Sequence, residues 1–485
     1  MLRIICEQSK ASPRALDQCT DVEDQGSRAM KRGSSSIRQV AILAAVLMSL
    51  SGAVANAAEW AAVGSRYQAM GGSGVASVND AFASYWNPAA LGNAQSYDAD
   101  LNFDFVAALE GNVVETVDDL NDIDDDLGDF LDALERGTGT VADAGELADL
   151  ERVRDTVLKL ADEGNGVAGA ASTGLSLRWE SYAVFSRADA QFAVSPVSDT
   201  VNVNIPGIGQ DYGDVTVNSL EDNESGARVR GLGVVESGVG YGHRFEVPFG
   251  DVVAEALRLD VIGLDDLGTI SAGANLKYLH GITFNNYGKF HDENDDEKLG
   301  KLKFGDSDYR KESGNFGLDL GLLYEPADWL AIGFMARNVN SPKFKAARDA
   351  APNSKKNFQL DAQARGGIAI YPFKNRSLVI ASDLDLTENE SDLLDGFKSR
   401  LWSFGAEYTL PIPVVKLALR GGGYTNTASG AGGAFTFTGG LGLRVWLLSL
   451  DLAGGASPKG IDVGGGDELP SRLNFSAALA LKGNF

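Results

Sequence analysis

The last thirteen residues of the chain alternate strictly between two kinds of side chain. The odd positions are mainly large and apolar, and the even positions are small or polar: Leu473, Phe475, Ala477, Leu479, Leu481, Gly483 and Phe485 against Asn474, Ser476, Ala478, Ala480, Lys482 and Asn484. A β-strand turns successive side chains to opposite faces, so the pattern predicts a strand with one apolar face. A soluble sheet with one buried face alternates in the same way, so the rest of the chain has to decide between the two.

Strand-like segments recur along the whole chain. Fourteen of them have the length and alternation of transmembrane β-barrel strands, whose side chains face lipid and lumen in turn. They are residues 98–109, 170–179, 181–194, 229–245, 268–283, 313–324, 328–339, 360–371, 376–387, 400–410, 414–425, 434–445, 446–456 and 472–485.

The connections between these segments are sorted by length. Links from even to odd segments are mostly tiny, such as Glu180, 326–328 and 411–413, with 246–267 as the exception. Links from odd to even segments are mostly long: 110–169, 195–228, 284–312, 340–359, 388–399 and 457–471. Short turns on one rim and long loops on the other are typical of outer-membrane barrels. The sequence therefore predicts an all-β fold, a transmembrane antiparallel barrel of about 14 strands.

The N-terminal region predicts export. Basic residues from Met30 to Arg38 precede an apolar run at 40–50, and Ala55-Asn56-Ala57 is an A-x-A cleavage motif. These are the parts of a signal peptide, expected over 30–57 with cleavage near Ala57. Residues 1–29 resemble no targeting element, and we expect them to be an extension upstream of the true start at Met30.

Cysteine use and charge exclude several functions. Both cysteines, Cys6 and Cys19, lie before Met30, so the expected mature chain has no disulfide, no cysteine-bound metal and no thiol catalysis. Residues 1–57 hold seven basic and five acidic residues. The rest has 35 Lys and Arg against 62 Asp and Glu, a formal net charge of −27. Such a chain repels nucleic acid.

The long link at 110–169 has its own pattern. Apolar residues follow helical spacing on both sides of Gly137-Thr138-Gly139, which predicts an acidic helical hairpin inserted after the first strand. Its aspartates at 122–129 lack the glutamate of a calcium loop, since Ala133 stands at the twelfth position. We therefore expect a solvated acidic face and no metal site.

Two motifs carry a resemblance to known barrels. Arg66, the run 69–72 and Asn87-Pro88-Ala89 resemble the N-terminal plug of FadL-type outer-membrane channels, which carry hydrophobic compounds. The resemblance implies a plug at 58–97 inside a barrel at 98–485. The run "DLGLLYEPADWLAIGFMARNVNSPKF" and others in the C-terminal half resemble barrel proteins named for conjugal transfer, TraF. The terminal Phe485 resembles the signal read by the barrel assembly machinery, which would place the protein among outer-membrane lipids.

The candidate site residues lie on the expected plug and on the lumen-facing positions of the strands. One hypothesis is that plug residues pair with the wall and gate the lumen; the alternative is that the wall charges only solvate the lumen and stabilise the barrel. The candidates are Arg66, Asp80, Trp86, Asn87, Pro88 and Ala89 on the plug, and Asp319, Arg337, Arg365, Asp383, Asp385, Glu407 and Arg420 on the wall.

Two functions remain open. One is a plugged channel for passive uptake of a hydrophobic or amphipathic small-molecule ligand; the other is an accessory barrel of a conjugation or secretion apparatus. We expect no enzyme and no cofactor, because the three histidines stand near no nucleophile elbow or zinc spacing. An apolar pocket lined by Phe82, Tyr85 and Trp86 would favour transport, and an ion-paired lumen without a cavity would favour the accessory function.

Overall fold

The computed structural model describes residues 60–93, 97–110, 155, 165–197, 226–246, 268–289, 308–347, 356–410, 412, 415–429, 435–462 and 468–483. The chain divides into compact units at 1–53 and 54–485, and every described residue belongs to the second. The signal peptide, its cleavage point, Phe485 and nearly all of the predicted helical hairpin lie outside the described residues.

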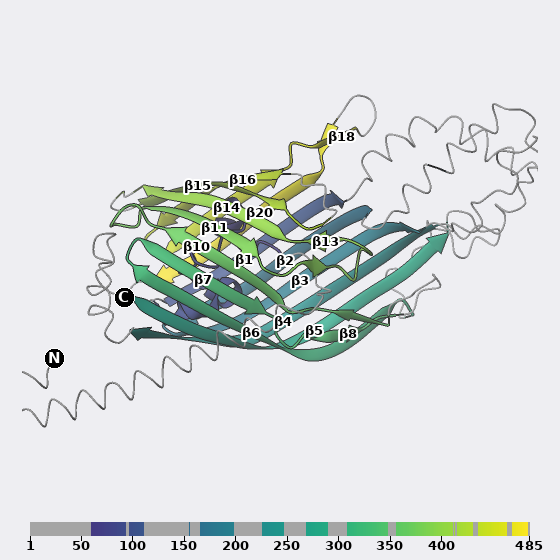
Figure 1. Ribbon diagram of the computed structural model, residues 1–485, viewed down its shortest axis with the longest axis horizontal. Coiled ribbons are helices and arrows are strands. Elements are labelled where there is room, and N and C mark those ends of the chain that lie inside the picture. The colour runs from purple at the N-terminus through teal and green to yellow at the C-terminus, as the bar shows by residue number, and fades with distance from the viewer. Residues whose placement is uncertain are drawn as a thin grey trace, which may run out of the picture. The chain divides into compact units, whose positions relative to one another are not determined.

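Fourteen antiparallel strands form one closed barrel, as predicted (Figure 1). The first and last close it, with register from Tyr97 opposite Gly483 to Ala108 opposite Arg472. The strands are β1 (Tyr97–Glu110), β2 (Gly166–Trp179), β3 (Tyr182–Val197), β4 (Gly226–Glu246), β5 (Thr269–Lys289), β6 (Arg310–Ala327), β7 (Leu330–Arg337), β10 (Gln363–Ile370), β11 (Leu378–Asp385), β14 (Leu401–Leu410), β15 (Val415–Asn426), β16 (Phe435–Val445), β17 (Leu448–Ala456) and β20 (Arg472–Gly483).

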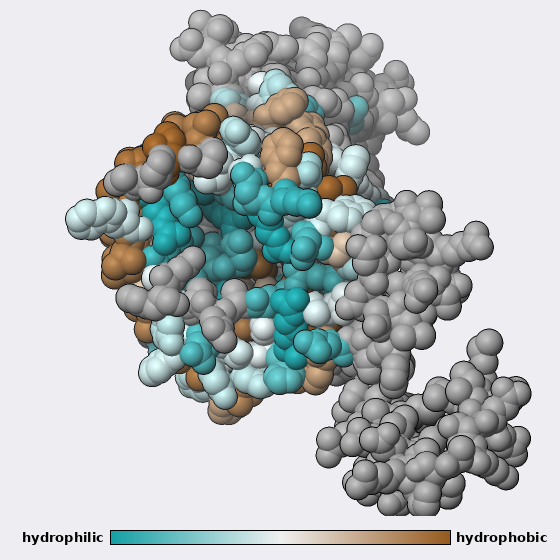
Figure 2. Space-filling model, turned by 90° about the vertical axis from the view of Figure 1, so that its left-hand side faces the viewer, coloured by the Kyte–Doolittle hydropathy of each residue, from teal (hydrophilic) through white to brown (hydrophobic). Residues whose placement is uncertain are grey.

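The alternation in the sequence sorts side chains between the two faces of this barrel. On β1, Leu101 and Phe103 are about half exposed outside, whereas Asp100 and Asn102 are buried inside. This is the reverse of a soluble protein and fits a barrel surrounded by lipid. Figure 2 looks at one end, where hydrophilic residues gather in the middle and hydrophobic ones at the margin. Among the described residues, no helix is long and apolar enough to cross a membrane.

Two details of the connections correct the predictions. The turns predicted as Glu180 alone and as nothing after Val445 are two-residue turns, Glu180–Ser181 and Trp446–Leu447, because two residues are the usual minimum for reversing a tight hairpin. The insertion predicted to reach residue 169 ends earlier, since Val167 to Ala170 already pair with β1.

Three of the long links contain short hairpins that the sequence did not reveal. They are β8 (Lys343–Lys345) with β9 (Asn357–Gln359), β12 (Asn389–Glu390) with β13 (Lys398–Ser399), and β18 (Gly460–Asp462) with β19 (Glu468–Pro470). Phe344 and Phe358 of the first are fully buried and pack in a cluster with Leu279 and Leu394. The links that hold β8, β9, β12 and β13 therefore fold inward, because their Phe344, Phe358 and Phe397 rings find apolar partners in this cluster.

Residues 60–93, here called the inner segment, lie inside the ring of strands (Figure 1). The inner segment contains α3 (Ser65–Ala69), α4 (Ala83–Trp86) and the 3₁₀ turn η2 (Pro88–Gly92). Trp60, Tyr67 and Trp86 are almost completely buried and form its core together with inward residues such as Met335. Helices of four and five residues are not stable alone, so the wall must hold this shape.

Candidate functional site in the barrel lumen

The inner segment packs against glycines that lie opposite one another on neighbouring strands of the wall. Gly242 on β4 is opposite Gly273 on β5, which is opposite Gly321 on β6. A Cβ at Gly242 would lie 2.6 Å from the carbonyl oxygen of Pro88, and one at Gly273 would overlap the Pro88 backbone. Only glycine lets two backbones approach so closely. The abundance of glycine inside strands thus has a specific cause in this region of the wall.

The Asn87-Pro88-Ala89 motif lies against these glycines. The Asn87 amide donates to the carbonyl oxygens of Val75 at 3.0 Å and of Leu322 on β6 at 2.9 Å. Its oxygen accepts from the nitrogen of Ala89 at 3.1 Å, which caps η2, with Pro88 at the first helical position. Asparagine before proline is a favourable way to begin such a turn. Asn87 therefore orders the inner segment and attaches it to the wall.

Replacing Asn87 by alanine should lower the free energy of unfolding by about 2 kcal/mol, because the cap and two buried hydrogen bonds are lost together. Denaturant unfolding of the purified protein in detergent measures the change. The matched control is Asn315→Ala, whose side chain donates to the carbonyl of Lys343 at an exposed position. Water can replace that bond, so an equal loss in both variants would contradict this role for Asn87.

A chain of buried ion pairs joins the inner segment to β14, β15 and β17. The Arg66 guanidinium donates to both oxygens of Glu407, each at 2.9 Å. Arg420 donates to the same carboxylate at 2.6 Å and to Asp451 at 2.5 Å. Arg66 and Arg420 thus share the Glu407 carboxylate, although Arg66 and Glu407 are 341 residues apart in the chain. Bidentate pairs of this kind fix orientation as well as charge.

Asp80 makes a second connection between the inner segment and the wall. It accepts from Lys482 of β20 at 3.3 Å and from the Tyr67 hydroxyl at 2.9 Å, and Arg66 lies 3.8 Å away. Burial disfavours the charged carboxylate, but the positive charges of Lys482 and Arg66 outweigh it, so the pKa of Asp80 is lowered. Asp80 therefore stays ionised at neutral pH.

The predicted wall residues of β10 and β11 meet the glycine-rich part of the inner segment. One oxygen of Asp383 accepts from the backbone nitrogens of Gly74 at 2.7 Å and Val75 at 2.8 Å. Arg365 pairs with Asp385 at 2.5 Å. The guanidinium of Arg365 also lies over the ring of Trp60, 4.6 Å from its centroid. Anionic and cationic groups thus both hold the segment, through backbone and aromatic partners.

The remaining candidates differ in how directly they contact the inner segment. Arg337 lies over the rings of Trp60 at 5.3 Å and Tyr85 at 4.3 Å. Trp86 is buried and donates to the carbonyl of Val63 at 3.0 Å. Asp319 instead contacts residues of the wall, including Lys277 at 3.0 Å and the backbone nitrogen of Asn338 at 2.9 Å.

Several contacts of the inner segment come from residues that the sequence analysis did not single out. Asp104 on β1 accepts from the nitrogen of Gly64 at 3.2 Å, and Arg178 on β2 donates to the carbonyl of Ala90 at 3.1 Å. Ser476 on β20 lies 2.7 Å from Ser65, oxygen to oxygen. The alternation of the strands places all three on the inner face. The sequence therefore predicts that they face the lumen, but it does not predict which residues they contact.

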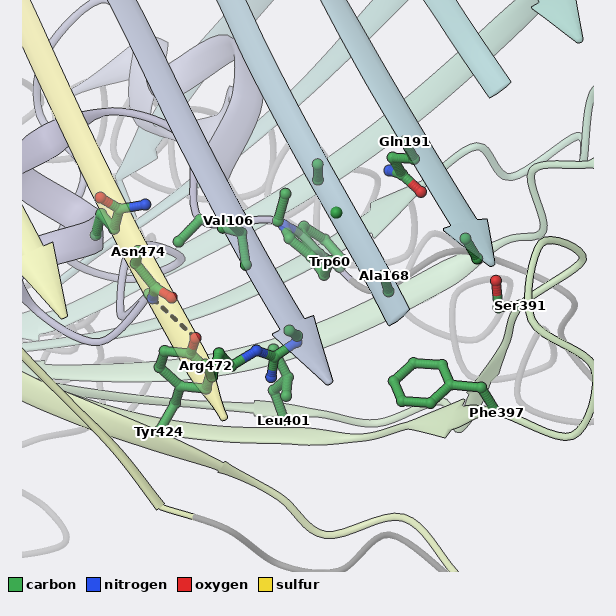
Figure 3. A pocket seen from close by; sticks show the side chains of 18 of the residues that line it. Trp60, Val106, Ala168, Gln191, Ser391, Phe397, Leu401, Tyr424, Arg472 and Asn474 are labelled. Atoms are coloured by element: carbon green, nitrogen blue, oxygen red, sulfur yellow. Dashed lines mark hydrogen bonds between the residues drawn. The ribbon is translucent and has the colours of Figure 1, made fainter. Parts of the chain in front are cut away.

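A cavity lies between the inner segment and the inward-folded link at 391–397 (Figure 3). It encloses about 850 Å³ of empty volume, including open solvent at its mouth. Its lining is largely apolar, with Trp60 from the inner segment, Val106 and Ala168 from the wall, and Phe397 from the link among the contributors. An apolar pocket lined by Phe82, Tyr85 and Trp86 would have favoured transport. None of these three residues lines this cavity, and all three pack in the core of the inner segment.

The family model described as "F plasmid transfer operon, TraF, protein" matches residues 84–385. The chain belongs to the TraF family. The resemblance noted in its C-terminal half is thereby confirmed. Among curated proteins, no match to this TraF-family chain was found.

Solved structures similar to this TraF-family barrel include a hydrocarbon channel and a toluene transporter. "TodX deltaS2S3 mutant monoaromatic hydrocarbon channel" has 13% identity and a TM-score of 0.44, covering 87% of this chain and 99% of that one. The Ralstonia pickettii toluene transporter TbuX has 14% identity, a TM-score of 0.42 and coverages of 87% and 98%. A Pseudomonas aeruginosa FadL homologue has 11%, 0.39, 89% and 98%. These likenesses are too distant to transfer a ligand.

Among the described residues of this TraF-family barrel, no group of three or more His, Cys, Asp or Glu side chains is arranged to hold a metal ion. The acidic side chains that face the lumen pair with arginine or lysine, as at Glu407 and Asp80, or accept hydrogen bonds from backbone nitrogens, as at Asp383.

Proposed function

We propose that this barrel lies in the bacterial outer membrane and is a channel for passive uptake of hydrophobic or amphipathic small molecules, with the inner segment as its plug. The observation that carries the proposal is the largely apolar cavity between the inner segment and the link at 391–397. Natural ligand sites are concave, mostly apolar and equipped with a few polar groups. The signal peptide expected at 30–57 and the apolar outer face support the location.

The second candidate is an accessory barrel of a conjugation or secretion apparatus. Its support is the name of the family, which refers to an F plasmid transfer operon, and the dense ion pairing between the inner segment and the wall. A plug held by so many bonds would suit a barrel that carries no cargo. The two candidates differ in whether small molecules cross the barrel. In a plugged channel, uptake requires the inner segment to move.

A reversible lock on the inner segment tests the channel. The mature chain has no cysteine, and the hydroxyl oxygens of Ser65 and Ser476 are 2.7 Å apart, so the double variant S65C/S476C should form a disulfide on oxidation. We expect proteoliposomes with the reduced variant to take up a hydrophobic fluorescent probe. Oxidation should stop uptake, because the inner segment is then bound covalently to β20, and reduction should restore it.

The matched control is S186C/S237C, which joins β3 to β4 on the outer face across an oxygen distance of 2.9 Å. Its disulfide does not touch the inner segment, so oxidation should leave uptake unchanged. Equal uptake by the locked and unlocked S65C/S476C protein would contradict a moving plug. Absence of uptake by every reduced variant would contradict the channel and favour the accessory barrel.

A further inference from the structure

The cavity beside the inner segment contains a buried amide with no hydrogen bond. Gln68 of α3 is 1% exposed and lines the cavity, and neither its amide nitrogen nor its oxygen has a hydrogen-bond partner among the described residues. Burying an amide without partners is costly, so native proteins rarely leave both atoms unpaired. A partner from outside the protein chain would remove this cost.

Four further unpaired polar atoms belong to residues that line the same cavity. Within the described part of the chain, the indole nitrogen of Trp60, the hydroxyl of Ser403, the side-chain oxygen of Asn474 and one guanidinium nitrogen of Arg365 have no hydrogen-bond partner. Figure 3 shows Trp60 and Asn474 facing this space, with Asn474 bonded through its nitrogen to the Tyr424 hydroxyl at 2.8 Å. The free atoms include both donors and acceptors, and they come from the inner segment, β10, β14 and β20.

The charged residues of the lining do not offer an uncompensated charge deep in the cavity. Arg365 is 1% exposed and forms an ion pair with Asp385, which is equally buried. Arg472 is half-buried, and its guanidinium lies 5.5 Å from the centroid of the Tyr424 ring. An anionic head placed at Gln68 would add a charge beside the buried Arg365–Asp385 pair, in which the two charges already balance, and this is costly.

We propose that the cavity binds an amphipathic ligand whose head is uncharged and both donates and accepts hydrogen bonds, as a primary amide does. The head pairs with both amide atoms of Gln68, and Ser403 and Trp60 offer further bonds. The apolar body lies against Leu393, Leu394 and Phe397, which line the other side of the cavity. This inference rests on the proposed channel and names the class of molecule that it selects.

Matched ligands of one chain length test the proposal. Binding of octanamide, octanoate and octane to the full-length protein in lipid nanodiscs is measured by calorimetry at pH 8, with empty nanodiscs subtracted. We expect octanamide to bind more tightly than octanoate. In Gln68→Leu the affinity for octanamide should fall by about tenfold, equivalent to ~1.4 kcal/mol, and the affinity for octane should not fall. Ser403→Ala should also weaken octanamide binding. Because Ser403 lies on β14, this change leaves every side chain of the inner segment unaltered.

Gln359→Leu is the matched control, because Gln359 lies on β9 outside the lining of the cavity, and its side chain donates to Asp361. It should leave the affinity for octanamide unchanged. Octanoate binding as tightly as octanamide, or unchanged octanamide binding in both Gln68→Leu and Ser403→Ala, would overturn the proposal. The latter result would mean that water alone satisfies Gln68. Uptake of the hydrophobic probe in such a case would leave the channel standing, so the two failures are distinguishable.

Discussion

Replacing Gly273 by valine is expected to displace Asn87-Pro88-Ala89 from the wall and to raise ion conductance through the barrel. The new Cβ would overlap the Pro88 backbone, which cannot rotate away as a flexible side chain could. Overpacking of this kind costs about 1–3 kcal/mol. Each ~1.4 kcal/mol changes the ratio of docked to displaced segment tenfold. Conductance in planar bilayers and proteolysis of residues 60–93 measure the effect.

Gly421→Val is the matched control for this prediction. Gly421 lies on β15, and the nearest atom to a Cβ there is the carbonyl oxygen of Thr438, 4.0 Å away. The same change in side chain thus meets open space instead of the inner segment. Conductance and proteolysis should match the unaltered protein. Equal conductance in both variants would mean that the paired glycines of β4, β5 and β6 are not what holds the inner segment.

Replacing Glu407 by glutamine should destabilise the docked inner segment by about 3 kcal/mol, because removing one partner leaves buried positive charge uncompensated. Both Arg66 and Arg420 depend on this carboxylate, although Arg66 keeps Asp80 and Arg420 keeps Asp451. Denaturant unfolding in detergent, followed at the tryptophans, measures the loss. Proteolysis of residues 60–93 in the same samples shows whether the segment has left the wall.

Glu312→Gln supplies the comparison, since it neutralises a carboxylate of the same kind at the surface. Glu312 pairs with Arg310 at 2.5 Å, and both side chains are about half exposed. Solvent screens such a pair, so its loss should cost less than about 1 kcal/mol. If Glu407→Gln cost no more than Glu312→Gln, the buried network would not be what fastens the inner segment.

The lumen combines the two features that were expected to separate transport from an accessory function. Arg66, Asp80 and Asp383 fasten the inner segment by ion pairs and backbone hydrogen bonds. A largely apolar cavity remains beside Trp60 all the same. A bound segment with an adjacent cavity is what a closed channel needs, because tight fastening prevents leakage while the cavity receives a ligand. The lock between Ser65 and Ser476 tests this combination directly.

The strands of the barrel wall could be predicted from the sequence, but the packing inside the barrel could be predicted only in part. The alternation of Leu101 and Phe103 with Asp100 and Asn102 gave the inner and outer faces, since side-chain direction in a strand depends only on position parity. The motif at Asn87 lies in the segment that the structure has inside the ring of strands. The sequence did not show which aromatic residues line a cavity: Trp60 does, whereas Phe82 and Trp86 pack in the core of the inner segment. Aromatic residues alone do not reveal which of them face a void.

By itself the sequence determined the class of fold, the number of strands and which side chains face the lumen, because these follow from a period of two and from the lengths of the links. Only the tertiary structure decided which of these residues meet. Arg66 and Glu407 are 341 positions apart, and their contact depends on the register of all fourteen strands and on the path of the inner segment between them. Gln68 shows the same limit: the sequence did not single it out, and only the closed barrel turns it into an unpaired amide beside a cavity.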